Sequence, residues 1–182
     1  MAERLLLVGM MGAGKSTVAR LAAKRLGWTW IDTDVEITRT GGATVAELFA
    51  RDGEAQFRRD EASALQTALG HVGPLVLSVG GGAVLDPGNR DTLRAAGTVV
   101  WLRARPETLI ERVHDGGGRP LLAGATAQDR EESLRRIDAE RRALYAEVAD
   151  EIVDVDDVDA QRVAERVVEC VGESALGRQA RP

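Results

Sequence analysis

Short apolar runs alternate along the chain with longer stretches in which apolar residues recur at helical spacing. The apolar runs predict buried strands at residues 5–8, 28–31, 75–79, 99–102 and 151–154. The longer stretches predict helices at residues 16–26, 44–69, 87–95, 106–114, 128–148 and 158–171. Strands that are apolar throughout, each followed by a helix, indicate a parallel sheet with helices on both faces. We therefore expect a three-layer α/β/α fold.

Two of the predicted helices begin with capping signals. Thr44 and Glu47 have the spacing of a capping box, in which each side chain accepts a hydrogen bond from the other residue's backbone N–H. Asp86 precedes Pro87, and an Asp N-cap followed by proline is typical of a helix start. In parallel folds of this kind, ligands bind at the carboxyl ends of the strands, so chemistry is expected there.

Composition favours one domain with an aliphatic core. The chain has 182 residues, of which 44% are hydrophobic and only 3% aromatic. That length suits a single domain, which we assign to residues 1–171, and the polar residues 172–182 are expected to form a flexible tail. The tryptophans lie in predicted strands, so we expect Trp28, Trp30 and Trp101 in the core.

Charge and cysteine content exclude several classes of protein. The 24 basic and 29 acidic residues are well mixed, so a nucleic-acid partner is not expected. The single cysteine, Cys170, excludes an internal disulfide framework and a multi-cysteine zinc site, and it fits a reducing compartment. The first apolar run is too short for a signal sequence or a membrane span. We therefore expect a cytoplasmic protein. Since no heptad pattern appears, we expect a monomer.

The sequence GMMGAGKST, at residues 9–17, follows the first predicted strand and opens the first predicted helix. It matches the pattern GxxxxGK[ST] in the strand-to-helix context that a phosphate-binding loop requires. Backbone N–H groups would cradle the phosphates of a nucleotide, Lys15 would reach the β- and γ-phosphates, and the Ser16 hydroxyl would bind Mg²⁺. The alternative is an ordinary strand–turn–helix corner. The nucleotide-binding residues predicted here are Gly12, Ala13, Gly14, Lys15, Ser16 and Thr17.

Two acids follow the second predicted strand directly. Asp32 and Asp34 are two residues apart, so in extended backbone their side chains would have similar orientations. One would face the nucleotide's metal and the other a substrate hydroxyl; the alternative is an Asp-rich helix cap. The third strand ends at Ser78 without an acid, so Asp32 is the better-placed candidate for the metal.

Arginines and glycines supply further candidates. Arg58 and Glu61 are three residues apart on a predicted helix, where a surface ion pair is the commoner interpretation. The glycines at 80–82 end the third strand, and they would allow a ligand to approach the backbone closely or form a loose turn. The glycines at 116–118 precede Arg119 in a segment that is either a mobile lid or a plain loop. Arg112 would lie along an adenine or in solvent.

The ordered set of motifs resembles the shikimate kinase family over about residues 4–171. It consists of the phosphate loop, DTD at 32–34, FRRDE at 57–61, GGG at 80–82, RPLL at 119–122 and RRALY at 141–145. The resemblance implies a nucleoside-monophosphate-kinase-like fold with a five-stranded parallel sheet in the order 2-3-1-4-5. It also implies a substrate-binding segment at about 33–61 and a lid at about 113–124. The implied reaction is the MgATP-dependent phosphorylation of the 3-hydroxyl of shikimate, in aromatic amino-acid biosynthesis.

The resemblance also assigns roles to individual residues. On the substrate side, Asp34 would accept hydrogen bonds from ring hydroxyls, and Glu61 would steady Arg58. The shikimate carboxylate would be held by Arg58 and Arg141, and the same pocket would be lined by backbone N–H groups of Gly80, Gly81 and Gly82. On the nucleotide side, Ser16 and, through water, Asp32 would orient Mg²⁺. Phosphoryl charge would be stabilised by Lys15 and Arg119, and the adenine would be flanked by Arg112 and the loop near Asp157 and Val158.

Two alternatives stay open at this point. The first is a kinase of another substrate, such as gluconate or a nucleoside monophosphate; Arg58, Arg141 and the glycines at 80–82 argue against these two, although another hydroxy acid would suit the same chemistry. The second is a nucleotide-binding switch without turnover, against which Arg119 and the acids at 32–34 argue. Asp34 is either a general base or a residue that only orients the hydroxyl.

Overall fold

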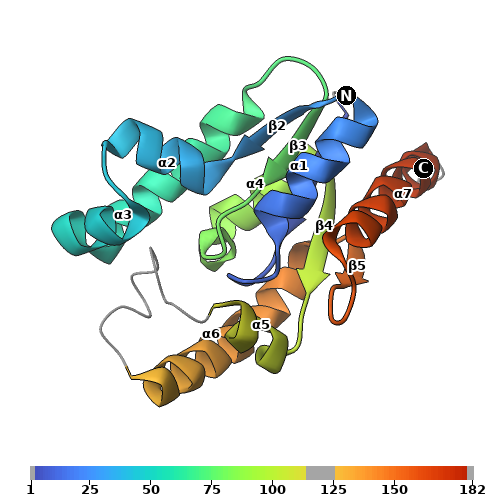
Figure 1. The fold of residues 1–182 in the computed structure, drawn as a ribbon. Coiled ribbons are helices and arrows are strands. Elements are labelled where there is room, and N and C mark those ends of the chain that lie inside the picture. The colour runs from blue at the N-terminus through green and yellow to red at the C-terminus, as the bar shows by residue number, and fades with distance from the viewer. Residues whose placement is uncertain (1–2, 114–125, 180–182) are drawn as a thin grey trace.

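Five parallel strands form the sheet at the centre of the molecule (Figure 1). The computed structural model describes residues 3–113 and 126–179. The strands are β1 (Arg4–Val8), β2 (Thr29–Asp32), β3 (Leu75–Ser78), β4 (Thr98–Arg103) and β5 (Glu151–Asp154), and their order in the sheet is β2-β3-β1-β4-β5. The predicted strand order and parallel arrangement are therefore confirmed.

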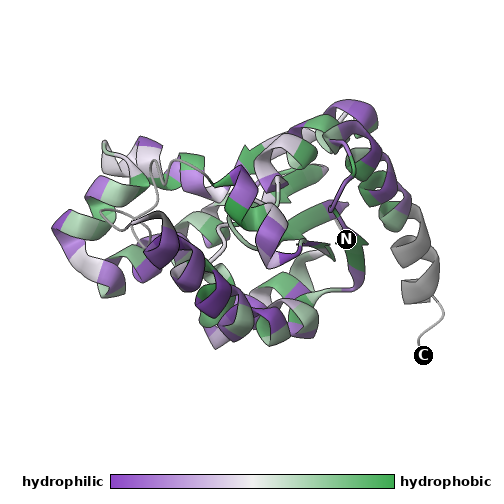
Figure 2. Cartoon of the chain, turned by 60° about the horizontal axis from the view of Figure 1, so that its bottom comes forward, coloured by the Kyte–Doolittle hydropathy of each residue, from purple (hydrophilic) through white to green (hydrophobic). Residues whose placement is uncertain are grey.

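Helices cover both faces of the sheet. On one face lie α1 (Lys15–Leu26) and α7 (Ala160–Gln179), and the other face is covered by α3 (Val45–Leu69), α4 (Pro87–Ala96) and α6 (Ala127–Val148) (Figure 1). The central strand β1 is buried on both faces, and Leu5, Leu6 and Leu7 have no exposed surface. In Figure 2 the strands are apolar and the outward surfaces of the helices carry most of the hydrophilic residues. The apolar segments of the sequence therefore form the strands of the middle layer.

The helix starts show how local sequence sets the element boundaries. The capping box of Thr44 and Glu47 is present at the start of α3, and Asp86 caps α4 with Pro87 in its first turn. A second capping box, formed by Thr126 and Asp129, begins α6. The short helices α5 (Pro106–Arg112) and η1 (Ala83–Leu85) complete the set of described helices, together with α2 (Thr33–Gly41).

Several predicted boundaries need correction. The helix α2 was not predicted, because its start depends on a side-chain cap from Asp32 rather than on an apolar pattern. The last helix continues past the predicted end at 171 to Gln179, in a stretch without proline. Trp30 is 36% exposed, so its predicted place in the core is wrong; it lies on β2, an edge strand of the sheet.

A kink at Gly53 divides α3 into two halves. Gly53 has φ 78° and ψ 165°, a backbone conformation that glycine adopts without steric cost. The helix resumes after Gly53, and its second half carries Phe57, Arg58 and Glu61. A separate small apolar cluster of Ile37, Leu48 and Phe57 joins α2 to α3. No helix in the described part of the chain is long and apolar enough to cross a membrane.

Candidate active site

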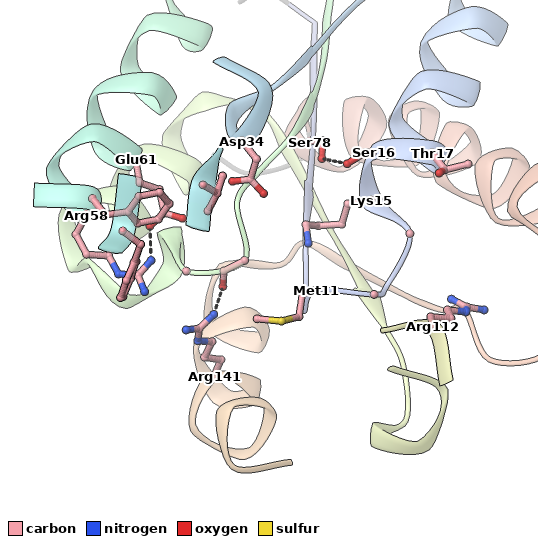
Figure 3. Close-up of a pocket in the computed structure, with 17 residues that line it drawn as sticks. Met11, Lys15, Ser16, Thr17, Asp34, Arg58, Glu61, Ser78, Arg112 and Arg141 are labelled. Carbon is pink, nitrogen blue, oxygen red and sulfur yellow. Dashed lines mark hydrogen bonds and ion pairs between the residues drawn. The ribbon is translucent and has the colours of Figure 1, made fainter. Parts of the chain in front are cut away.

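A cavity of about 560 Å³ opens at the carboxyl ends of β1 and β3 (Figure 3). It is lined from the loop after β1, from α1, α2, α3, α5 and α6, and from the glycines after β3. Most of the predicted site residues line it: Gly12, Gly14, Lys15, Ser16, Thr17, Asp34, Arg58, Glu61, Gly81, Gly82, Arg112 and Arg141. In the view of Figure 3, Arg58, Glu61 and Arg141 lie on one side and Thr17 and Arg112 on the other.

The loop after β1 has the geometry of a phosphate-binding loop. Gly12 and Gly14 have φ values of 85° and 88°, in the left-handed region that favours glycine. Lys15 folds back over the loop, and its Nζ atom donates to the carbonyl oxygens of Gly9 at 2.8 Å and Met10 at 3.0 Å. Because α1 begins at Lys15, its N-terminal N–H groups and partial positive charge face the cavity. Anionic phosphates suit this end of the cavity.

Hydroxyl groups and a carboxylate meet beside this loop. The Oγ atoms of Ser16 and Ser78 are 3.5 Å apart, and Asp32 pairs with Ser78 in the register of β2 and β3. The Asp32 carboxylate caps α2: its Oδ1 atom accepts from the N–H groups of Asp34 at 2.9 Å and Val35 at 3.4 Å. Asp32 is 5% exposed and does not line the cavity, so the capping interpretation of this acid holds, and any contact with a cation would need a bridging water.

Two carboxylates flank Gly80. A Cβ atom on Gly80 would lie 2.7 Å from Oδ1 of Asp34 and 2.7 Å from Oε1 of Glu61, so no side chain fits between them. The N–H of Gly80 donates to Oγ1 of Thr33 at 2.8 Å, which ties the glycine loop to the start of α2. Gly80 does not line the cavity, and its N–H group is already used by Thr33.

Arg58 is held by acids on its own helix. Its Nη1 atom donates to Oε2 of Glu61 at 2.8 Å and its Nη2 atom to Oε1 of Glu54 at 3.2 Å. The Glu61 side chain is 3% exposed, so the pair is not the ordinary surface ion pair that the spacing alone favours. The guanidinium lies against the glycine loop, and a Cβ atom on Gly82 would overlap Nη1 of Arg58.

Arg141 reaches the same glycine loop from α6. It is 4% exposed, and its Nη1 atom donates to the carbonyl oxygen of Gly81 at 3.0 Å. The Nε atoms of Arg58 and Arg141 are both buried and have no hydrogen-bond partner within residues 3–113 and 126–179. Both guanidinium groups line the cavity, and their planar sets of N–H donors are suited to a carboxylate.

Several residues near this site were not predicted from the sequence. Tyr145 is buried and donates through its hydroxyl to the Gly81 carbonyl at 2.6 Å. Burial raises the pKa of the Tyr145 hydroxyl above its ordinary value, so the group stays a neutral donor. Phe49 and Phe57, whose ring centroids are 5.6 Å apart, give the cavity an apolar wall. Only the adjacency of Phe57 to Arg58 and of Tyr145 to the arginines of α6 could have suggested them.

The far end of the cavity carries Arg112. Its Nη2 atom donates to the Val155 carbonyl at 3.0 Å, which joins α5 to the loop after β5. In that loop Asp157 has φ 56° and forms an ion pair with Arg105 at 2.8 Å, while Val158 does not line the cavity. Arg119 and most of the predicted lid lie outside the described residues. Ala13, within the phosphate loop, is buried and does not line the cavity.

Comparisons with known proteins agree on one family. The family model for shikimate kinase matches residues 11–172. A shikimate kinase of Aromatoleum aromaticum is 49% identical over 150 residues, which cover 82% of this chain and 83% of that protein. A shikimate kinase of Symbiobacterium thermophilum is 42% identical over 167 residues, covering 91% and 94%.

Solved structures extend the comparison to the fold. A shikimate kinase from Acinetobacter baumannii, in complex with shikimate, has a TM-score of 0.90 and 35% identity, and the match covers 97% of this chain and 96% of that one. A gluconokinase from Sinorhizobium meliloti has a TM-score of 0.58 and 18% identity over 99% of this chain and 98% of its own, a likeness of fold alone.

Proposed function

This chain belongs to the shikimate kinase family and phosphorylates shikimate with ATP, and we propose that it transfers the γ-phosphoryl group to the 3-hydroxyl of shikimate in the cavity of Figure 3. The observation that supports this proposal is the pair of arginines, the buried Arg141 and the partly buried Arg58, in one cavity with the phosphate loop. The products are shikimate 3-phosphate and ADP, and the pathway is aromatic amino-acid biosynthesis.

The arginine pair supplies the carboxylate-binding end of the proposed acceptor site. A planar guanidinium offers parallel N–H donors that match the two oxygens of a carboxylate. Arg58 and Arg141 approach from different helices, and each has a buried Nε atom without a partner in the described structure. Glu61 fixes Arg58 through the 2.8 Å contact, so the clamp is ordered before the acceptor arrives. Gly81 and Gly82 let the ring approach the backbone.

Asp34 supplies the acceptor for ring hydroxyls in this proposal. It lines the cavity beyond the cap of α2, and its Oδ1 atom faces the space over Gly80. Its carboxylate accepts the hydrogen bond of the attacking hydroxyl and so directs an oxygen lone pair at the γ-phosphorus. As the new O–P bond forms, the bond from the γ-phosphorus to the β,γ-bridging oxygen breaks and ADP leaves with that oxygen. The hydroxyl proton passes to the Asp34 carboxylate if Asp34 is a general base, or to the transferred phosphoryl group if Asp34 only orients the hydroxyl.

The nucleotide phosphates occupy the loop of residues 9–17 in this proposal. The N–H groups of Gly12, Ala13 and Gly14, followed by those of Ser16 and Thr17 at the start of α1, surround the phosphates. Lys15 moves from the loop carbonyls to the β- and γ-oxygens and stabilises the charge that moves during transfer.

The residues beside this loop fit a magnesium ion bound together with ATP. Ser16 would hold the ion through its hydroxyl, and Asp32 would hold it through water. Within the described residues, no group of three or more His, Cys, Asp or Glu side chains could bind a metal by itself. This agrees with an ion coordinated mainly by phosphate oxygens and water, as Mg²⁺ prefers. When bound, the ion neutralises charge on the β- and γ-phosphates.

The adenine and the transferring phosphoryl group would be contacted by residues at the far end of the cavity and in the lid. Arg112 and the loop near Asp157 and Val158 would flank the adenine, and the bond from Arg112 to the Val155 carbonyl supports this, since it holds the side chain beside that loop. Arg119 would contact the transferring phosphoryl group from the lid at about 113–124. We further propose that the protein is a cytoplasmic monomer. We also propose that it has no nucleic-acid partner, because the net charge is −5 and basic residues are dispersed.

A coupled assay of ADP release over a panel of acceptors tests the proposed function. The panel contains shikimate, gluconate and nucleoside monophosphates, with an acceptor-free reaction as the baseline. We expect ADP release above baseline only with shikimate. Comparable turnover of gluconate or a nucleotide would refute the proposal, and calorimetric binding of ATP without any turnover would favour a nucleotide-binding switch.

A further inference from the structure

The carbonyl oxygen of Gly81 accepts two hydrogen bonds from α6. Tyr145 donates its hydroxyl proton across 2.6 Å, and Nη1 of Arg141 donates across 3.0 Å. The two donors are four residues apart, so they lie on the same face of the helix, one turn from each other. One backbone oxygen therefore joins the arginine of the carboxylate clamp to a tyrosine that has no place in the proposed chemistry.

Gly81 is also confined by the phosphate loop. A Cβ atom on Gly81 would lie 3.3 Å from the carbonyl oxygen of Gly9 and 3.6 Å from the N atom of Met11. Both atoms belong to the phosphate loop. Gly81 is thus packed against both the phosphate loop and Tyr145, whose Oη atom would lie 3.7 Å from the same Cβ atom.

Tyr145 itself is fixed by its surroundings. It is fully buried, and its ring centroid is 5.8 Å from that of Trp101 on β4. Water cannot replace its hydroxyl without opening the core. The surrounding core as a whole therefore holds the Tyr145 ring, and the hydroxyl sets the position of the Gly81 carbonyl.

We propose that Tyr145 is a positioning residue for the acceptor: its hydroxyl fixes the Gly81 carbonyl and, through it, the guanidinium of Arg141. This inference rests on the proposed function, because it assumes that Arg141 binds the acceptor carboxylate. With the Tyr145 hydroxyl present, the Gly81 carbonyl is fixed and anchors one N–H of Arg141, so the guanidinium keeps its place in the lining of the cavity. Without the Tyr145 hydroxyl, Arg141 is the single remaining donor from α6 to the Gly81 carbonyl. The carbonyl and the guanidinium of Arg141 then shift together.

The Tyr145→Phe variant tests this role, since it removes the hydroxyl and keeps the ring against Trp101. We expect the KM for shikimate to rise roughly three- to tenfold, the change expected from one lost hydrogen bond. The KM for ATP and kcat should stay within about twofold of the unaltered enzyme, because positioning of the carboxylate is a ground-state effect. An unchanged KM for shikimate, or an equal rise in the KM for ATP, would overturn the inference.

A matched control separates the hydroxyl from general loosening of the core. Trp101→Phe removes part of the packing around Tyr145 and leaves its hydroxyl in place. It should lower the melting temperature and leave the KM for shikimate unchanged. If Trp101→Phe raised that KM as much as Tyr145→Phe does, packing would explain the effect and the positioning role would be refuted.

A double-mutant cycle identifies the route of the effect. If Tyr145 acts through Arg141, the rise in KM caused by Tyr145→Phe should shrink in an Arg141→Lys background, because that arginine no longer provides the clamp. Full additivity would overturn the proposal. Failure of the proposed function is distinguishable, since it would appear as absent shikimate turnover in the unaltered protein.

Discussion

Nη1 of Arg58 lies 2.8 Å from Oε2 of Glu61, and the carboxylate of that pair is almost completely buried. The other oxygen of Glu61 lies on the same side of Gly80 as Oδ1 of Asp34, with each 2.7 Å from the position of a Cβ atom. Two carboxylates and a guanidinium therefore meet around one glycine. Because buried charges are tolerated when paired, Glu61 is best understood as the fixed partner that orients Arg58.

Replacing Arg58 by Lys should raise the KM for shikimate. Lysine keeps the charge but loses the planar set of donors, so the contact to Glu61 and the bidentate grip on a carboxylate cannot both form. The expected loss is about 1–3 kcal/mol of binding, read from KM in the ADP-release assay. Arg59→Lys is the matched control, because Arg59 is exposed and bonds only Gln56 in the described structure. An unchanged KM for Arg58→Lys would contradict the proposed role.

Adding a methyl group at Gly80 should damage the acceptor site. Gly80→Ala places a Cβ atom 2.7 Å from the carboxylates of Asp34 and Glu61, so at least one of them must move. We expect the KM for shikimate to rise at least tenfold while the KM for ATP stays unchanged, as measured by steady-state kinetics. Gly88→Ala, in the first turn of α4 and away from the cavity, should leave both constants unchanged. Equal kinetics for the two variants would show that space at Gly80 is unimportant.

Thr33 should contribute to stability through a single hydrogen bond. It is 1% exposed, and its Oγ1 atom accepts from the N–H of Gly80 at 2.8 Å. Thr33→Val removes the acceptor and leaves a buried donor unsatisfied, which costs about 1–3 kcal/mol in the free energy of unfolding. Urea unfolding measures the loss, and Thr33→Ser should recover most of it because it restores the hydroxyl. A Val variant as stable as the unaltered protein would show that Gly80 finds another acceptor.

The features that the sequence predicted correctly depend on local patterns. The phosphate loop, the capping box of Thr44 and the cap of Asp86 each lie within a few consecutive residues, and the sheet order followed from a family resemblance. The burial of Glu61 could not be predicted, because it depends on the packing of α3 against the glycines after β3.

The features that the sequence did not predict join distant segments. The contact of Tyr145 with Gly81 spans 64 positions in the chain, and that of Thr33 with Gly80 spans 47. Helix α2 depends on a side-chain cap, and the kink in α3 on one positive φ at Gly53. Neither leaves a periodic signal in the sequence.

Lys15 should be required for turnover. Its ammonium now lies against the carbonyls of Gly9 and Met10, within the loop that surrounds the phosphates. Lys15→Met keeps the length of the side chain and removes the charge, and we expect kcat to fall about 10²–10³-fold, the usual effect of losing one group that stabilises transition-state charge. Lys24→Met is the matched control, because Lys24 lies at the far end of the same helix. A Lys15→Met variant with kcat near normal would exclude the loop as the site of phosphoryl transfer.

The single tyrosine of the chain allows its ionisation to be followed directly. Burial raises the pKa of Tyr145, so the folded protein keeps the phenol protonated above pH 10, where an unfolded chain releases the proton. The stability that comes from the neutral phenol is complete below about pH 10 and declines above it by about 1.4 kcal/mol per pH unit, until the folded pKa is reached. Phenolate absorbance should therefore appear only on unfolding, and Tyr145→Phe should lose stability less steeply with rising pH. Phenolate absorbance near pH 10 in the folded protein would contradict the closed environment of Tyr145.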